Sequence, residues 1–317
     1  MRSIFLLLLL FAWLLPLSAQ NWPDPTPKFL STEQVLTHGI TAVQEYESLK
    51  KLADSQGEEA AHVFSVIKYP NARTEYNAAG KPTRKFTYDT QTGREVTDLR
   101  YRYNNAGLLE RMEETTYISI EINNSVRREE FTTLTHYAYD QQGRLVHMFV
   151  TYKDEESKQE EKFYTWNAAG QLLQKTSWHL IEGYCDGQME YMTQSTYHHD
   201  GQQVTITQIA LDPKTKAPIG DKNDYLQEEV LAFDGVGRLT RQTIHQLPTD
   251  SYYAQSYTYQ KGHLFKCQYF SKQPTDLFLE EEYFYNKAGL PVMIRSRGEN
   301  SEMDGLERVF EYFYQDE

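Results

Sequence analysis

Residues 131–145, FTTLTHYAYDQQGRL, join an alternating segment to a turn signal. Every second residue before the turn, ending at Tyr137 and Tyr139, lies on one face of an extended chain, because successive side chains of a strand point to opposite sides. Asp140 has the short side chain that accepts backbone N–H bonds, and Gly143 suits the positive φ of a type I turn with a glycine bulge. The segment therefore predicts the tip of a β-hairpin with one aromatic face.

The same unit, an aromatic residue followed by Asp or Asn in most copies and then a glycine, recurs eight more times. The aromatic and glycine positions are Tyr76 with Gly80, Tyr88 with Gly93, Tyr103 with Gly107, Trp166 with Gly170, Tyr197 with Gly201, Phe233 with Gly237, Tyr259 with Gly262, and Tyr285 with Gly289. From Gly107 onward, successive tips are separated by 25 residues (Gly237 to Gly262) to 36 residues (Gly201 to Gly237), enough for two strands and a return loop. The chain is therefore predicted to be mainly β, an antiparallel meander of up to 18 strands in one long, twisted or coiled sheet with its aromatic face inward.

Two of these units, Tyr139–Leu145 (YDQQGRL) and Phe233–Leu239 (FDGVGRL), resemble the YD repeat of the bacterial Rhs family. The resemblance covers about residues 69–317. It implies a long β-sheet that winds into a shell around a toxin or other cargo, and a setting outside the cytoplasm. It supplies no catalytic residue. This chain differs from the family in being far shorter, in its irregular repeat spacing and in having no recognisable toxin domain.

The first residues of the chain predict export. Arg2 precedes an unbroken apolar run from Ile4 to Leu15, and Pro16, Leu17, Ser18 and Ala19 follow, which is typical of a secretory signal peptide over residues 1–19, although Leu17 is larger than the usual residue at that place before the cut. The run is shorter than the roughly 20 apolar residues that a helix needs to span a bilayer, so we expect no integral membrane segment after cleavage. The mature protein is expected in the periplasm, at the cell surface or in the medium.

Residues 20–62 are predicted to form a Pro-rich leader and a single helix. Ser31 and Gln34 have the spacing of a capping box. Apolar residues recur at intervals of three to five from Val35 to Leu52, which predicts a helix over about residues 32–53. We expect this helix to cover an edge or end of the sheet, because an exposed terminal strand pairs with other chains. Residues 63–317 are predicted to form the hairpin-repeat domain.

Charge and cysteine content narrow the partners and the cross-links. The chain has 32 basic and 45 acidic residues, so loss of Arg2 with the signal leaves 31 minus 45, or a net charge of −14. Nucleic acid is therefore not an expected partner, since it requires a basic surface. In an open sheet Cys185 and Cys267 are five or six strands apart, roughly 25 Å, which is too far for a disulfide. We expect two free thiols.

The aromatic face supplies the candidate ligand-binding residues. Tyrosine and tryptophan rings stack on sugar rings or on apolar ligands, although the same rings can instead be the core of a thin repeat protein. The candidates are Tyr101, Tyr103, Tyr137, Tyr139, Tyr164, Trp166, Tyr257 and Tyr259. We predict no cofactor, metal or catalytic residue. His198, His199 and Asp200 lack the converging ligands of a metal site, and the acids at 155–156 and 280–282 are more typical of solvated charges.

These observations favour an exported, non-catalytic scaffold that binds a polysaccharide or a protein. An outer-membrane β-barrel is the alternative, because export, antiparallel strands and alternating short and long connections all suit one. Against it, residues 171–179 place polar side chains on both faces of their strand, so neither face suits lipid. A glycan-acting hydrolase is the second alternative, and it requires two converging carboxylates.

Overall fold

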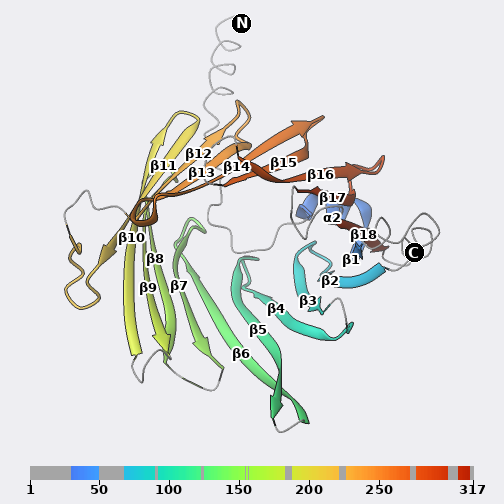
Figure 1. The fold of residues 1–317 in the computed structure, drawn as a ribbon, viewed down its shortest axis with the longest axis horizontal. Coiled ribbons are helices and arrows are strands. Elements are labelled where there is room, and N and C mark those ends of the chain that lie inside the picture. The colour runs from blue at the N-terminus through green and yellow to red at the C-terminus, as the bar shows by residue number, and fades with distance from the viewer. Residues whose placement is uncertain are drawn as a thin grey trace, which may run out of the picture.

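The protein is described here from a computed structural model, which describes residues 30–49, 68–89, 92–122, 125–153, 155, 157–182, 188–220, 226–271, 276–298 and 306–314. The predicted signal peptide lies outside these residues. The elements in chain order are α2 (Thr32–His38), β1 (Ile40–Leu49), β2 (Lys68–Tyr76), β3 (Pro82–Tyr88), β4 (Glu95–Tyr103), β5 (Leu109–Ile122), β6 (Ser125–Tyr139), β7 (Leu145–Tyr152), β8 (Lys158–Trp166), β9 (Leu172–Glu182), β10 (Gln188–Asp200), β11 (Gln203–Leu211), β12 (Gln227–Phe233), β13 (Leu239–Gln246), the 3-10 turn η1 (Leu247–Thr249), β14 (Ser251–Gln260), β15 (His263–Ser271), β16 (Leu277–Tyr285), β17 (Pro291–Arg297) and β18 (Leu306–Tyr314). Figure 1 shows them as one ring of strands.

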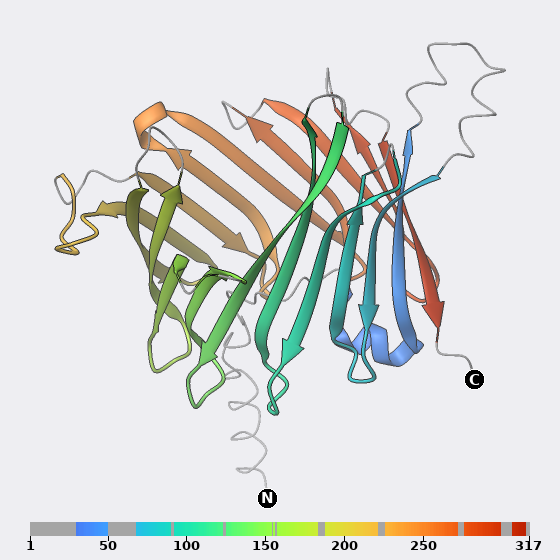
Figure 2. The same ribbon diagram turned by 90° about the horizontal axis from the view of Figure 1, so that it is seen from below.

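The sheet is a closed antiparallel barrel of 18 strands. Strands β2 to β18 each pair with their neighbours in the chain, as the predicted meander requires, and β1 pairs with both β2 and β18. Val43 of β1, for example, lies opposite Thr74 on one side and Tyr312 on the other. Figure 2 shows the resulting wall from the side. The prediction of a long open or coiled sheet is therefore wrong, because the first strand joins the last and leaves no sheet edge.

The N-terminal helix is shorter than predicted. It ends at His38, where Gly39 adopts a left-handed φ of 61° and caps the last turn, and residues 40–49 form β1 instead of continuing the helix to residue 53. The capping box is confirmed: the Gln34 backbone N donates to Ser31 Oγ (3.1 Å), and the Ser31 backbone N donates to Gln34 Oε1 (3.0 Å). No helix among the described residues is long and apolar enough to cross a membrane.

Helix α2 closes part of one end of the barrel. Val35 packs with Val43, Ile294 and Phe310, which lie on the inner faces of β1, β17 and β18. Figure 2 shows α2 at this end, beside the turn between β2 and β3. A Cβ on Gly80 of that turn would meet the Thr32 carbonyl oxygen at 2.9 Å, so the helix and the turn are in close contact.

The nine predicted turns are present, and their glycines all have positive φ. At the quoted segment, the Asp140 backbone N donates to the Arg144 carbonyl oxygen (2.9 Å) and the Gly143 N donates to the Asp140 carbonyl oxygen (3.0 Å). One assignment is wrong. At the turn that contains Gly201, strand β10 continues to Asp200. The residue in the place of the tip aromatic is therefore His199 and not Tyr197.

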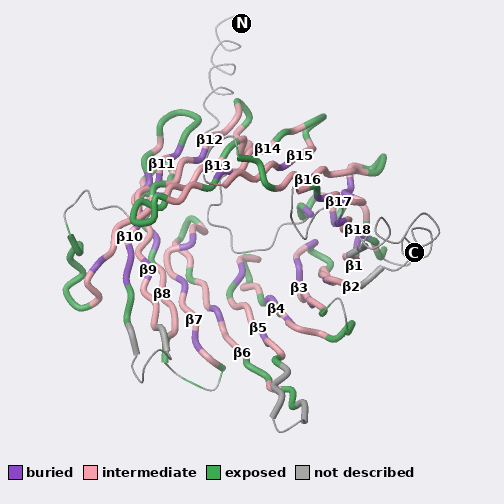
Figure 3. The backbone as a smooth tube through the Cα atoms, viewed as in Figure 1, coloured by how far each residue is buried: buried purple, intermediate pink, exposed green. Residues whose placement is uncertain are grey.

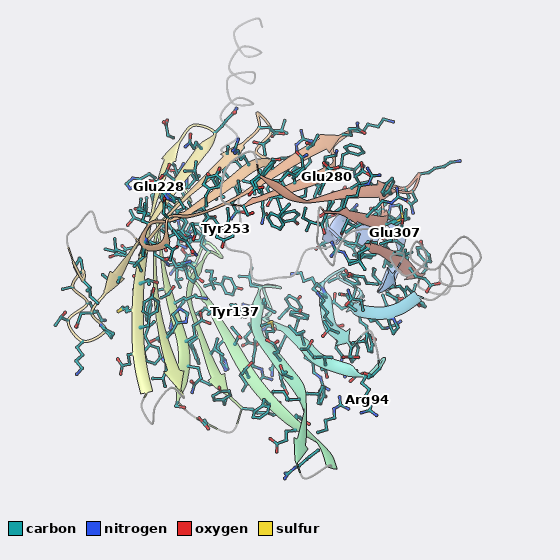
Figure 4. All side chains as sticks on the ribbon, viewed as in Figure 1. Arg94, Tyr137, Glu228, Tyr253, Glu280 and Glu307 are labelled. Carbon is teal, nitrogen blue, oxygen red and sulfur yellow. The ribbon has the colours of Figure 1, made fainter. Side chains whose placement is uncertain are left out.

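The two faces of the wall differ in chemistry. Figure 4 shows Tyr137 and Tyr253 pointing into the barrel, whereas Glu228 and Glu307 lie on its outer side. Because pairing register fixes the face of every strand residue, the predicted aromatic face is the inner one. Figure 3 shows the buried residues as short stretches spread around the wall, so the barrel has no single central core.

Ion pairs cover the outer face. Asp98 is only 2% exposed and accepts bonds from Arg84 Nε and Nη2, both at 2.7 Å, and from Arg100 Nη2 at 3.0 Å. Burial alone would raise the pKa of Asp98, but the hydrogen bonds from the two guanidinium groups outweigh it and hold the pKa below its usual value. Lys266 pairs with Glu280 at 2.9 Å on another part of the same face. The outer wall therefore carries paired charges, and aromatic rings such as Phe149 and the 47% exposed Phe163 lie on the same face.

Candidate functional site

Seven aromatic side chains, six at hairpin tips and Tyr312 near the end of β18, bond to the backbone of the preceding hairpin. Tyr139 Oη donates to the Leu109 carbonyl oxygen at 2.8 Å, and Trp166 Nε1 donates to the Leu145 carbonyl oxygen at 2.8 Å. The other bonds of this set run from Tyr103 to Pro82, His199 to Leu172, Tyr259 to Leu239, Tyr285 to Leu264 and Tyr312 to Pro291. We call these seven donors the tip girdle. Sequence analysis missed it, although the preference for Tyr, Trp or His over Phe at the tips was its signal.

The tip girdle changes the role of four predicted ligand-binding residues. Tyr103, Tyr139, Trp166 and Tyr259 lie on the inner face as expected, and each uses its polar atom to hold the neighbouring hairpin. Their rings still face the lumen side of the wall, but their hydroxyl or N–H groups are already committed to the fold. Their main role is therefore to stabilise the barrel, and their polar groups are not available to bind a ligand.

The other four candidates lie one step farther from the tips on the same face. Tyr101 and Tyr164 are buried, at 7% and 8% exposure, and Tyr137 and Tyr257 are half-buried. Burial raises the pKa of Tyr137 and of Tyr257 to about 12 and raises the pKa of Tyr101 and Tyr164 as well. Tyr137 and Tyr164 pack with a cluster that includes Leu145 and Leu172. These four rings are packed into the wall, so little of their surface is available to a ligand.

Aromatic surface that stays open lies farther from the tips. Tyr253 is 48% exposed and Tyr191 is 39% exposed, and both belong to the inner face. Tyr191 lies opposite His179 of β9, with their ring centroids 6.3 Å apart. The sequence already placed Tyr253 on the same face as Tyr257 and Tyr259, but its distance from the tip, which determines its exposure, was not apparent.

Charged residues share the inner wall with the aromatic rings on β8, β9 and β12. Lys162 pairs with Glu160 at 2.5 Å, and Glu229 accepts a bond from Gln242 Nε2 at 2.6 Å. Lys175 is half-buried and has no ion pair with a described residue. Burial lowers the pKa of Lys175, and the Lys162 ammonium lowers it further, whereas Glu229 and Glu160 oppose the shift. An anion placed beside Lys175 would meet an ammonium group that has no direct ion pair with a described carboxylate.

A second polar cluster lies across the barrel on β15 to β18. The Glu281 carboxylate is 5% exposed and accepts from Arg308 Nη2 (2.5 Å) and from the hydroxyls of Tyr269 and Tyr283 (3.0 Å each). The neighbouring Cys267 is a free, buried thiol, and burial raises its pKa to about 11. These groups partner one another, so the cluster fixes the register of the strands rather than presenting a reactive group.

The remaining weighed residues do not converge. Glu281 points inward while Glu280 and Glu282 lie on the outer face, where Lys266 and Arg297 pair with them. His199 Nε2 donates to the Leu172 carbonyl oxygen at 2.8 Å, and His198 lies on the opposite face. Cys185 lies outside the described residues.

Comparisons with known proteins identify no family for this chain. No family model matches the chain, and no curated protein does. A porin-like protein from Bacteroides vulgatus is 13% identical over 63% of this chain and 97% of its own, with a TM-score of 0.31. A porin-like protein from Bacteroides uniformis is 9% identical over 87% of this chain and 97% of its own, with a TM-score of 0.33. A TcdB2-TccC3 structure without its hypervariable C-terminal region is 14% identical over 74% of this chain and 14% of its own, with a TM-score of 0.23.

The resemblance to the Rhs family is therefore wrong for this chain. The turn units that suggested it are real, but they join neighbouring strands of one closed ring and not a long sheet that winds into a shell. The closed barrel that the outer-membrane alternative required is present, and the open hairpin-repeat scaffold of the first hypothesis is not.

Proposed function

We propose that this chain is an exported β-barrel that binds a saccharide in its lumen without changing it chemically, with water on both sides of its wall. The observation that carries the proposal is the contrast between the two faces of the wall. Ion pairs are distributed over the outer face beside a few aromatic rings, whereas the inner face combines many tyrosine rings with hydroxyl, amide and charged groups.

The outer face supports water rather than lipid around the barrel. Each arginine or lysine at the middle of the lipid-facing wall costs about 2 to 4 kcal/mol in an outer-membrane barrel. Arg84, Arg100, Lys266 and Arg297 all lie on strands of the outer wall and pair there with carboxylates. Burying several such pairs in hydrocarbon is costly, because desolvation of both partners offsets their attraction.

The inner face supports a saccharide ligand. Barrels of 16 to 18 strands leave a water-filled interior, because their side chains do not reach across it. Tyr191 and Tyr253 expose flat aromatic area to this interior, and such rings stack on sugar rings. Lys175, Ser177 and Ser195 supply polar groups on the same face. Rigid rings beside a few polar groups are the usual composition of a binding wall.

A channel in the outer membrane is the second candidate. Closure and an even number of strands, 18, support it, since outer-membrane barrels share both properties, and the predicted signal peptide suits either location. The two candidate functions differ in the medium around the outer wall, which is water for the binding protein and membrane lipid for the channel.

Expression of the full chain with its leader in a Gram-negative host, followed by separation of membranes from the soluble fraction, distinguishes the candidates. We expect the protein to be recovered without detergent and to bind at least one oligosaccharide by calorimetry. Tyr253→Ala should weaken this binding. Phe163→Ala, which removes an exposed aromatic ring of the outer face, should not. Recovery only in detergent, with ion conductance in planar bilayers, would instead establish the channel. Water-soluble protein that binds no saccharide would refute the binding proposal.

A further inference from the structure

We propose that the inner wall at β8 to β10 is a subsite for the acidic group of a sugar, a carboxylate or a sulfate. This inference rests on the proposed saccharide-binding function and names the class of saccharide. The subsite consists of Lys162, Lys175, Ser177, Thr193 and Ser195, which we call the lysine–hydroxyl patch.

Strand pairing brings the patch together. Lys175 of β9 lies opposite Tyr164 on β8 and opposite Ser195 on β10. Ser177, two residues along β9, lies opposite Lys162 on β8 and opposite Thr193 on β10. The two lysines are therefore diagonal neighbours on one face, and diagonal neighbours are about 7 to 8 Å apart, within reach of long side chains. Both ammonium groups can approach one anion.

Small hydroxyl side chains form the floor between the lysines and the next strand. Ser177, Thr193 and Ser195 are each 3% exposed. The Thr193 hydroxyl accepts a bond from Gln208 Nε2 at 3.3 Å. The Ser177 and Ser195 hydroxyls have no hydrogen-bond partner anywhere in the described ranges. Although the two residues are almost fully buried, their hydroxyl oxygens are not enclosed by protein, so both are open to a ligand that accepts hydrogen bonds on the lumen side.

The charge on Lys175 is also unmatched. Lys162 has Glu160 as its ion-pair partner, but Lys175 has none within the described chain. Glu229, a nearby acid, is occupied by the Gln242 amide. A ligand oxyanion would accept from the Lys175 ammonium and from the two serine hydroxyls together, and charge-assisted hydrogen bonds of this kind are the strong ones.

An aromatic ring beside the patch favours a sugar acid over a free inorganic anion. Tyr191 belongs to the same face of β10 as Thr193, two residues away, and is 39% exposed. Its ring offers a stacking surface for a sugar whose acidic substituent reaches Lys175. Because the full chain is acidic, with a net charge of −13, nonspecific attraction would not draw anions into the lumen. Recognition of the acidic group therefore depends on the Lys175 ammonium and the neighbouring serine hydroxyls.

Calorimetry with three probes tests the subsite: an oligogalacturonide, the matching neutral galacto-oligosaccharide and a sulfated galacto-oligosaccharide. We expect the acidic probes to bind more tightly than the neutral one. Lys175→Gln should weaken the acidic probes about tenfold, equivalent to about 1.4 kcal/mol, and leave the neutral probe unchanged. Lys175→Arg should restore most of the affinity. Lys214→Gln, which removes an exposed lysine outside the patch, is the matched control.

The outcomes separate the two proposals. Preference for the oligogalacturonide alone assigns the subsite to carboxylates, and equal binding of both acidic probes assigns it to oxyanions in general. Neutral and acidic probes that bind equally, with no effect of Lys175→Gln in a variant of unchanged melting temperature, would overturn the acidic subsite while the saccharide-binding function stands. If none of the probes binds, the acidic subsite falls, and the proposed function falls with it if broader saccharide screening also fails.

Discussion

The tip girdle makes a quantitative prediction about stability. Replacing Tyr103, Tyr139 and Tyr259 by Phe removes three hydroxyls that donate to backbone carbonyl oxygens at 2.8 to 2.9 Å and keeps the rings. A hydrogen bond of this kind contributes about 1 kcal/mol net, so the triple variant should lose about 3 kcal/mol of unfolding free energy if the distant sites add. For a chain of about 300 residues, with an unfolding entropy of about 2.1 cal/mol/K per residue, that loss lowers the melting temperature by roughly 5 °C.

Three tyrosines of the same face provide the control. Tyr101, Tyr164 and Tyr197 lie nearer the middle of their strands, and their hydroxyls have no hydrogen-bond partner among the described residues. Their triple Phe variant should be neutral or slightly stabilising, because it removes polar atoms from a partly dry environment. Thermal melts and urea titrations of both triples measure the difference. Equal effects of the two triples would show that the girdle bonds add nothing and that only the rings matter.

Three further predictions concern single sites. Gly143→Ala should cost about 1 kcal/mol, because alanine is strained at a φ of 77°, and the loss appears as a lower melting temperature. Asp98→Asn should cost about 2 kcal/mol at neutral pH. Because the folded pKa of Asp98 is depressed, the wild type should lose this contribution as the pH falls below about 4 through the folded pKa, and urea titrations across pH should show no matching loss in the variant. In Cys185→Ser, Cys267 should resist Ellman's reagent at pH 8 until the protein unfolds, since its pKa is raised to about 11, and a fast reaction in the native state would contradict its burial.

The sequence was most informative where structure is local. The Asp140–Gly143 turn and the alternation that ends at Tyr139 depend on a few adjacent residues, and both are as predicted. Closure was missed because residues 40–49 contain apolar spacings that fit a helix as well as a strand. Their strand partners, β2 and β18, are set by tertiary pairing that no local pattern encodes.

The inner wall shows the same limit. Its aromatic rings follow from alternation, but Lys162 and Lys175 occupy the same alternating positions and nothing in the sequence singles them out. Their neighbourhood appears only when β8, β9 and β10 are aligned in register. Likewise, tyrosines at the tips bond to the preceding hairpin, whereas tyrosines farther from the tips pack in the wall. Alternation predicts the face on which a tyrosine lies but not its distance from the tip.

The closing strand also has a kinetic consequence. Every other pairing joins neighbours in the chain, whereas the Thr41 hydroxyl donates to the Phe313 carbonyl oxygen across 272 residues. The hairpins can therefore form one after another during translocation, but the ring is completed only when the first strand to emerge meets the last. Such a distant contact carries the largest loop-closure entropy in the molecule. Until it forms, β1 and β18 are unprotected edges, so the interval before closure is when a chaperone would be needed most.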